Sequence, residues 1–453
     1  MQQDREMRRV FTRSFIGDRR GNVAAIFAVM LVPIVFMSGM ALDFSSAMQK
    51  RAKLNAAADA AALAAVTPAM MTQSSAAATT AATNIFTAQA SGISGLNYSA
   101  PTITVSDAGL YRTVTVSYTA TSVNNFPNVL GNQTWSLSGT SQASSYTAPN
   151  INFYLLLDNS PSMAVAATTA GINTMLAATA NAPSNGQNAG GCAFACHESN
   201  PSADNLGNPG GEDNYTLAKN LGVKTRIENM ATATQALMST AASTEAANNA
   251  TYKMAIYTFN NSGTSTVQTL TSNLTTAATA AGTIDVLEVY EESNGGMLTP
   301  TDVNDDTDTN FESAISQING VMPNPGTGAS TSTPQEVLFI VSDGVDDESN
   351  SSCSQPLSHG APIYRCMQPF DTTTCTTIQK RGILIAVLYT VYLPLTTNTF
   401  YNQWIAPFQS QIATNMQNCA SPGLFFSVTT DGDITAAMQS MFTQAVATAR
   451  LTK

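Results

Sequence analysis

The chain has 453 residues, which is enough for two or three domains with a sizeable core. Charged residues make up 11% of it, against about 25% in an average soluble domain, and the formal net charge is −11. An acidic chain repels phosphate backbones, so the composition argues against a nucleic-acid-binding protein.

The first 42 residues have the pattern of a membrane anchor. Residues 1–22 contain six arginines, and the uncharged stretch VAAIFAVMLVPIVFMSGMAL follows from Val23 to Leu42. These apolar residues span about 30 Å as a helix, the thickness of a bilayer core. Because arginine-rich flanks stay cytoplasmic, we expect residues 1–22 in the cytoplasm, a transmembrane helix over 23–42, and the rest exported. The competing interpretation is a cleaved signal peptide, whose apolar region usually has only about 7–15 residues.

Helical character continues past the apolar stretch. Residues 47–66 are dominated by alanine, the best helix former, and Pro68 supplies a stop signal. We therefore expect one helix from Val23 to about Val66. Its second half has two candidate roles: a stalk that holds the chain away from the membrane, or a helix packed on the next domain.

Residues 95–148 have the pattern of a small antiparallel sheet. Apolar and polar residues alternate from Thr113 to Thr121, at the period of two expected for a strand. Shorter stretches around Ile103 and Trp135 predict strands before and after it. Residues 43–148 are therefore expected to form a helix followed by a small β-rich segment.

Six cysteines all lie beyond residue 190: Cys192, Cys196, Cys353, Cys366, Cys375 and Cys419. An even number confined to the part expected outside the cytoplasm predicts disulfides, with Cys192–Cys196 as the leading local pair. The sequence does not choose among the other pairings. Cys192, Cys196 and His197 also allow a zinc site or a variant of a haem-attachment motif, and this alternative stays open.

Oxygen-bearing side chains follow two apolar stretches that predict buried parallel strands. The first stretch, FYLLL, runs directly into Asp158, Ser160 and Ser162, which form the pattern D-x-S-x-S. The second, VLFIV, is followed after one residue by Asp343. Because parallel strands bring their carboxyl ends to one edge of a sheet, these side chains should lie together. Hard divalent cations prefer such oxygen donors, so the pattern predicts a metal site; the competing interpretation is that the aspartates are turn and cap residues.

A third polar element lies between the two strands. In VNDDTDTNFESAI, Thr309 immediately precedes a helical stretch from Asn310 to Ile318 and is the candidate for a further hydroxyl ligand. Thr307 is its rival for this role. The acidic residues of the same segment lack the central Gly and terminal Glu of an EF-hand loop, so we interpret them as a solvated loop beside the metal.

Strand and helix patterns alternate through the rest of the chain. Further strands are expected in TYKMAIYTF, STVQTLTS, ILIAVLYTVYL and LFFSV, and helices over Thr216–Ser243, Phe400–Gln417 and Ile434–Ala449. This alternation predicts an α/β fold, with a doubly wound, mostly parallel sheet and helices on both faces. Residues 149–453 should form this domain, with cysteine-bearing insertions at about 183–215 and 345–380.

The N-terminal region resembles a known family. The stretches RRGNVAAIFAVMLVPIVF and ALDFSSAMQKRAKLNAAADAAALAAV, over residues 19–66, resemble the N-terminal segment of TadE/TadG-like proteins of the Flp (tight-adherence) pilus assembly machinery. Pilin-like members of that machinery usually carry a Glu before the Phe-Ala pair, where this chain has Ile26. The departure favours an anchored TadG-like component over a processed pseudopilin. The helix and small sheet of residues 43–148 are pilin-like in outline.

Residues 150–450 are similar to von Willebrand factor A domains, in which D-x-S-x-S, a threonine and an aspartate occur in this order. The resemblance implies that Ser160, Ser162 and Thr309 bind a divalent cation through their hydroxyls. Asp158 and Asp343 would then act largely through bound waters. Mg²⁺ or Ca²⁺ is the expected ion, with Mn²⁺ as a third candidate. Such an adhesion site takes a carboxylate from a protein partner at its open position.

The sequence predicts a binding protein and not an enzyme. It contains no G-x-S-x-G, P-loop, dinucleotide fingerprint or H-E-x-x-H, and its two histidines, His197 and His359, lie in the insertions. We expect a single-pass inner-membrane protein of the bacterial envelope that acts in adhesion or in interactions with pilus and secretion components. One alternative is a structural pilus scaffold without metal-dependent binding. The other is a metal-dependent hydrolase, for which a general base is not obvious.

Overall fold

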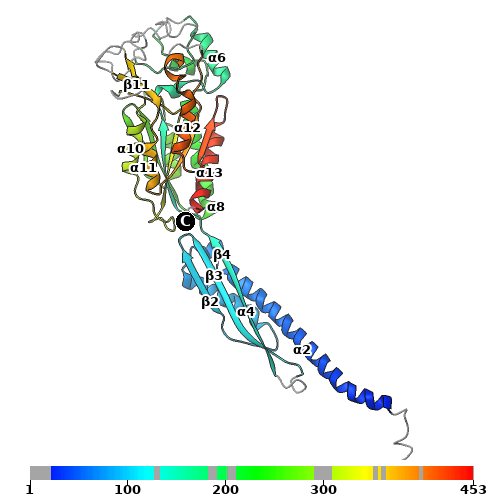
Figure 1. The fold of residues 1–453 in the computed structure, drawn as a ribbon. Coiled ribbons are helices and arrows are strands. Elements are labelled where there is room, and N and C mark those ends of the chain that lie inside the picture. The colour runs from blue at the N-terminus through cyan, green and yellow to red at the C-terminus, as the bar shows by residue number, and fades with distance from the viewer. Residues whose placement is uncertain are drawn as a thin grey trace, which may run out of the picture. The chain divides into compact units, whose positions relative to one another are not determined.

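The computed structural model describes residues 22–126, 133–181, 191–199, 201, 211–289, 309–349, 356–358, 364–396 and 401–451. The chain divides into two compact units, Met1–Thr147 and Ala148–Lys453 (Figure 1). Except for Asn22, the segment expected in the cytoplasm lies outside the described residues.

The first unit begins with a 43-residue helix, α2 (Asn22–Ala64). Its bounds confirm the prediction of one helix that continues past the apolar stretch. An 18-residue window in this helix has a mean hydropathy of 2.4, so α2 is long and apolar enough to cross a membrane. The side chains of this apolar part are mostly exposed, whereas buried alanines recur from Ala47 onward. One helix thus combines an uncovered apolar half with a half that packs on protein.

A small α+β fold follows the helix. Its elements are α3 (Pro68–Met71), α4 (Ser75–Ser91), β1 (Leu96–Tyr98), β2 (Thr102–Ala108), β3 (Tyr111–Val123) and β4 (Thr134–Tyr146). All strand pairs are antiparallel, with β3 between β2 and β4. The inward residues of β3, among them Val114 and Val116, pack with Leu54 of α2 and Phe86 of α4. The second half of α2 is therefore a helix packed on the sheet, the second of the two roles considered.

The second unit is built on a six-stranded sheet. Its strands are β5 (Ile151–Asp158), β6 (Tyr252–Asn260), β7 (Gly263–Thr271), β8 (Gln335–Ser342), β12 (Leu384–Thr390) and β13 (Phe425–Val428). The strand order is β13-β12-β8-β5-β6-β7, and only the edge strand β7 runs antiparallel. Every strand predicted for this part of the chain is present. In the central strands β5 and β8, the near-continuous apolar composition matches burial on both faces.

Helices cover both faces of this sheet. They are α6 (Thr169–Ala178), α7 (Asn214–Asn220), α8 (Arg226–Asn248), α9 (Leu274–Ala281), α10 (Phe311–Val321), α11 (Thr373–Lys380), α12 (Gln409–Cys419) and α13 (Ile434–Leu451). Alternate residues of β5 enter two separate cores: Phe153 packs with α8 and α13, and Tyr154 packs with α10, α11 and α12. Figure 1 shows α8 and α13 on one side of the sheet and α10 and α11 on the other. The predicted α/β fold with helices on both faces is thereby confirmed.

Two of the predicted helices differ from the observed ones. The stretch Thr216–Ser243 is not one helix, because α7 ends at Asn220 and α8 begins at Arg226. Gly222 between them has a φ of +70°, which a continuing helix does not allow. Within Phe400–Gln417, a π-helical turn at Tyr401–Ile405 precedes α12, and Phe400 itself lies outside the described residues.

Helix α13 has the amphipathic pattern expected for it. Ile434, Met438, Met441, Phe442 and Ala445 are all buried and contribute to one core. The methionines therefore fill the core and form no exposed binding patch.

The second predicted insertion contains a small sheet of its own. It consists of β9 (Val345–Ser349), β10 (Pro356–Ser358) and β11 (Tyr364–Pro369), which pair antiparallel around β11. A disulfide joins Cys375 at α11 to Cys419 at the end of α12, and Cys366 is also disulfide-bonded. Cys353 and His359 lie outside the described residues. Disulfides in this part of the chain follow the expectation from the even cysteine count.

The structure does not form the local disulfide that was expected between Cys192 and Cys196. Their backbones are tied to different elements. The N–H of Cys192 donates to the Thr179 hydroxyl at the end of α6, at 2.7 Å. The carbonyl of Cys196 accepts from the N–H of Tyr215 in α7, at 3.0 Å. The two residues are thus held by different helices, α6 and α7, and their nearness in sequence does not reveal this.

Glu336 at the start of β8 gives a pH-dependent prediction. Its side chain is buried; Oε1 accepts from Asn152 Nδ2 at 3.0 Å, and Oε2 has no hydrogen-bond partner. Burial raises the pKa of Glu336 to about 7, although the hydrogen bond from Asn152 and the charges of Arg381 and Lys253 lower it. A folded-state pKa above the unfolded value stabilises the protein at low pH, and this contribution is lost as the pH rises to about 7. We therefore expect Glu336→Gln to stabilise the second unit by about 2 kcal/mol at pH 8.5, with little effect near pH 4.5. Urea unfolding of both proteins at the two pH values measures this, and a pH-independent difference would contradict the assignment.

Candidate metal site

The candidate ligands lie where the sheet changes direction. From β5 the chain moves outward on one side to β6 and β7, then returns past β5 to place β8 on its other side. Strands β5 and β8 are parallel neighbours, so Asp158 and Ser342 end adjacent strands at the same edge of the sheet. In open α/β sheets, ligands bind outside the carboxyl ends of the strands at such a switch point.

Asp158 is the centre of a compact hydrogen-bond network. It is fully buried, and its Oδ1 accepts from the backbone N–H of Ser160 at 3.0 Å and from the Ser160 hydroxyl at 2.6 Å. Its Oδ2 accepts from the Ser342 hydroxyl at 2.6 Å. The hydroxyl oxygens of Ser160 and Ser162 are 3.0 Å apart. The turn that follows β5 therefore brings all three D-x-S-x-S side chains together.

Asp343 completes this group from the neighbouring strand. Its Oδ1 accepts from the backbone N–H of Val345 at 3.4 Å, while its Oδ2 is buried and has no hydrogen-bond partner. Burial raises the pKa of Asp343, and the nearby Ser162 hydroxyl and the charge of Arg226 oppose this effect. Arg226 is itself buried, with Nη2 donating to the carbonyl of Val391 at 2.7 Å. A carboxylate oxygen left in the interior without a donor is the kind of atom that a bound cation would satisfy.

The two aspartates repel one another in the absence of a cation. Burial first, and the charge of Asp343 second, raise the pKa of Asp158 to about 7, although hydrogen bonds from Ser160 and Ser342 lower it. A divalent ion favours the ionised form of both carboxylates. The donor set of hydroxyls and carboxylates fits Mg²⁺, Ca²⁺ or Mn²⁺, with Ser160, Ser162 and the two aspartates as the residues that would hold the ion.

Thr309 is placed by its backbone. It is buried, its N–H donates to the carbonyl of Asp347 at 3.0 Å, and its carbonyl accepts from the N–H of Asp347 at 2.9 Å. Strand β9 begins two residues after Asp343, so this pairing ties Thr309 to the segment that leaves the candidate site. Its rival Thr307 and the acidic run before it lie outside the described residues.

The sequence did not single out Ser342 and Arg226. The Ser342 hydroxyl supports Asp158 and also accepts from the N–H of Gly344 at 2.9 Å. Ser342 stands between an apolar strand and Asp343, and this position could have identified it as part of the site. Arg226 belongs to α8, which is far from Asp158 and Asp343 in the sequence, and no local sequence pattern linked it to the site.

His197 makes structural contacts. Its Nδ1 lies 2.9 Å from Asp213 Oδ2, and its ring packs on Tyr215 with ring centres 4.8 Å apart. Asp213 in turn caps α7 by accepting from the N–H of Thr216. These contacts tie His197 to the start of α7 and give no support to a zinc or haem site.

Solved structures with similarity to the chain include two pilus proteins. The vWF domain of the type V pili tip protein Mfa5 from Porphyromonas gingivalis is 8% identical, with 67% of this chain and 97% of that chain covered and a TM-score of 0.38. The pilus adhesin SpaC from Lactobacillus rhamnosus GG is 11% identical, with coverage of 77% and 34% and a TM-score of 0.35. The SpRpn10 VWA domain is 10% identical, with coverage of 65% and 95% and a TM-score of 0.30.

No curated protein matches the chain. A family model does match its N-terminal region, from residue 21 to residue 82. The match begins at the start of α2 and ends within α4, so it covers the apolar helix and the first elements packed on it. Residues 21–82 of the first unit therefore match the family model described as putative Flp pilus-assembly TadE/G-like.

Proposed function

We propose that this chain is a membrane-anchored component of a bacterial Flp-type pilus assembly. In this proposal the second unit binds a protein partner through a divalent cation at Asp158, Ser160, Ser162, Thr309 and Asp343. The TadE/G-like segment supports the pilus association. The observation that carries the binding site is the unpartnered, buried Oδ2 of Asp343 beside Asp158 at the switch point.

The chemistry of this site suits binding better than catalysis. Hydroxyl ligands are neutral, so an ion that they hold keeps most of its charge and attracts an acidic side chain from a partner. Hydrolysis would need a general base within reach of a bound water. Of the two histidines, His197 pairs with Asp213, and His359 is outside the described residues. We therefore propose a binding module that takes a carboxylate of a pilus or secretion protein.

The proposed topology places residues 1–22 in the cytoplasm and the second unit outside it. The disulfide Cys375–Cys419 is consistent with an oxidising compartment, and the apolar half of α2 with an inner-membrane anchor. Reporter fusions after Lys53 test this arrangement. Alkaline phosphatase, which folds only outside the cytoplasm, should be active there; activity of a cytoplasm-dependent reporter at the same position would refute it.

Metal-dependent capture of pilus subunits tests the binding role. The full chain in detergent is immobilised and offered purified Flp pilin from the same bacterium, in Mg²⁺ or in EDTA. We expect retention in Mg²⁺ that is lost in EDTA and in Asp158→Asn, which keeps the shape of the side chain but removes its charge. Glu288→Gln, at an exposed carboxylate, is the charge-matched control and should bind like wild type. Retention that is equal in EDTA would favour the scaffold alternative, and no retention under any condition would reject pilin as the partner.

A further inference from the structure

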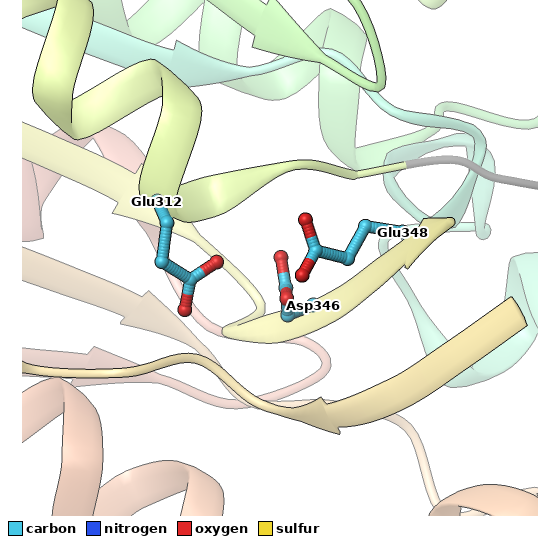
Figure 2. Close-up of side chains that lie close together, drawn as sticks. All are labelled: Glu312, Asp346 and Glu348. Carbon is cyan, nitrogen blue, oxygen red and sulfur yellow. The ribbon is translucent and has the colours of Figure 1, made fainter. Parts of the chain in front are cut away.

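Three carboxylates outside the candidate site converge from two elements. Glu312 lies in the first turn of α10, and Asp346 and Glu348 lie on β9. A carboxylate oxygen from each lies within 4.8 Å of the other two. Figure 2 shows the side chains of Glu312 and Glu348 turned toward Asp346 between them. Like charges at this separation repel, so a cation or a proton among the three carboxylates would stabilise the arrangement.

Asp346 is the buried centre of this cluster. It is fully buried; Oδ1 accepts from the backbone N–H of Phe311 at 2.9 Å, and Oδ2 has no hydrogen-bond partner. Glu312 repeats the pattern, because its Oε1 accepts from the N–H of Asp371 at 2.8 Å and its buried Oε2 has no partner. Among the described residues, no Lys or Arg forms a salt bridge with Asp346 or Glu312. The cluster thus contains two buried oxygens without a donor, which is costly unless a positive group lies near them.

We propose that Glu312, Asp346 and Glu348 bind a second divalent cation, with Ca²⁺ as the best fit. Two oxygens that ligate one Ca²⁺ at about 2.3–2.6 Å can lie at most about 5 Å apart. The three carboxylates meet this limit without any movement. Ca²⁺ accepts several carboxylates in flexible geometry, whereas Mg²⁺ demands a near-ideal octahedron and retains waters. Three ionised carboxylates around one ion therefore favour Ca²⁺.

This ion would fasten the start of α10 to β9. The elements already touch there, because Thr309 and Asp347 exchange two backbone hydrogen bonds and the Phe311 N–H is held by Asp346. A cation shared by Glu312 and the β9 carboxylates adds a side-chain link to the same junction. Since Thr309 lies at this junction, the second ion would fix the position of a candidate ligand of the first site. The second site does not depend on the first, which uses other side chains.

The alternative occupant is a proton. Burial, and next to it the charge of Glu312, raise the pKa of Asp346 to about 9, so a protonated Asp346 could donate to Glu312 in place of an ion. The two occupants predict different responses to Ca²⁺. A proton-sharing cluster gains nothing from the ion, whereas an ion site gains stability by mass action, about 2.7 kcal/mol at a hundredfold excess over its Kd.

Calorimetric titration of Ca²⁺ into the chelator-treated full chain in detergent tests the proposal. We expect the double variant Glu312→Gln/Glu348→Gln to bind one Ca²⁺ fewer, or to bind it more weakly by roughly tenfold or more, as is typical when groups supporting a metal are removed. Glu288→Gln is the control for charge and should behave like wild type. Asp158→Asn should keep this ion, which separates failure of the first site from failure of the second.

Folding of each variant is checked by circular dichroism. If the double variant does not fold, the single variant Glu348→Gln, at a half-exposed position, replaces it in the titration. Equal Ca²⁺ stoichiometry and affinity in wild type and in a folded variant would overturn the proposal. If Asp158→Asn binds no Ca²⁺, the three carboxylates hold no ion of their own. That result would also overturn the proposal, in favour of the shared proton.

Discussion

Replacing Gly344 with alanine should destabilise the second unit by about 3 kcal/mol. Gly344 has a φ of +76°, a conformation that costs other residues about 1–2 kcal/mol. A Cβ at this position would lie 2.7 Å from Ile412 Cγ2 and 2.9 Å from Met416 Cγ. Both of these α12 side chains are fully buried and have little room to move away, and overpacking of this kind costs about 1–3 kcal/mol. The strain in the backbone and the close contact with α12 add to each other, because Gly344 lies in the short connection between β8 and β9 that packs on α12.

Gly320→Ala is the matched control for this variant. Gly320 lies inside α10, where an added Cβ meets nothing within 4 Å. Alanine is a better helix former, so this change should leave stability unchanged or raise it by up to about 1 kcal/mol. Urea unfolding of the full chain in detergent, followed at the transition of the second unit, compares the two variants. Equal effects of Gly344→Ala and Gly320→Ala would show that the tight junction after Asp343 is not as described.

Removing the disulfide between Cys375 and Cys419 is expected to have a similarly large effect. The bridge closes a loop with a sequence separation of 44 residues and joins α11 to α12 within one core. Its loss frees the unfolded chain, which lowers stability by about 4 kcal/mol on the chain-entropy relation. Cys375→Ser/Cys419→Ser should therefore unfold at lower urea than wild type. A reducing agent should lower the midpoint of wild type more than that of the variant, which keeps the disulfide of Cys366. A double variant as stable as wild type would contradict this role.

Much of the fold was predictable because the central strands of the second unit are apolar and fully buried. Stretches such as those in β5 and β8 have few alternatives to burial in a parallel sheet, and alternation with helices then selects the α/β class. The break between α7 and α8 was not foreseen. Residues 216–243 have helical composition throughout, and only the backbone geometry of Gly222 shows that the chain turns there.

The candidate site was predictable in part because apolar strands mark where its aspartates lie. Asp158 and Asp343 follow apolar strands directly, so strand pairing alone brings them together. Thr309 was identified from its place before a helix, and the structure gives its backbone pairing with Asp347. The carboxylate cluster was not foreseen, because Glu312 and Asp346 are brought together by the contact of α10 with β9. No local spacing encodes that contact.

The proposed binding role depends on a divalent cation held by Asp158 and its neighbours. The most direct test is calorimetric titration of Mg²⁺ and Mn²⁺ into the full chain that carries Glu312→Gln/Glu348→Gln, so that the second cluster does not contribute. This protein should bind one ion, and the further change Asp158→Asn should abolish that binding while the chain stays folded. Asparagine can still accept from the Ser160 N–H, so the local turn is retained. Equal ion affinity with and without Asp158→Asn would mean that the D-x-S-x-S stretch is only a turn at the end of a strand.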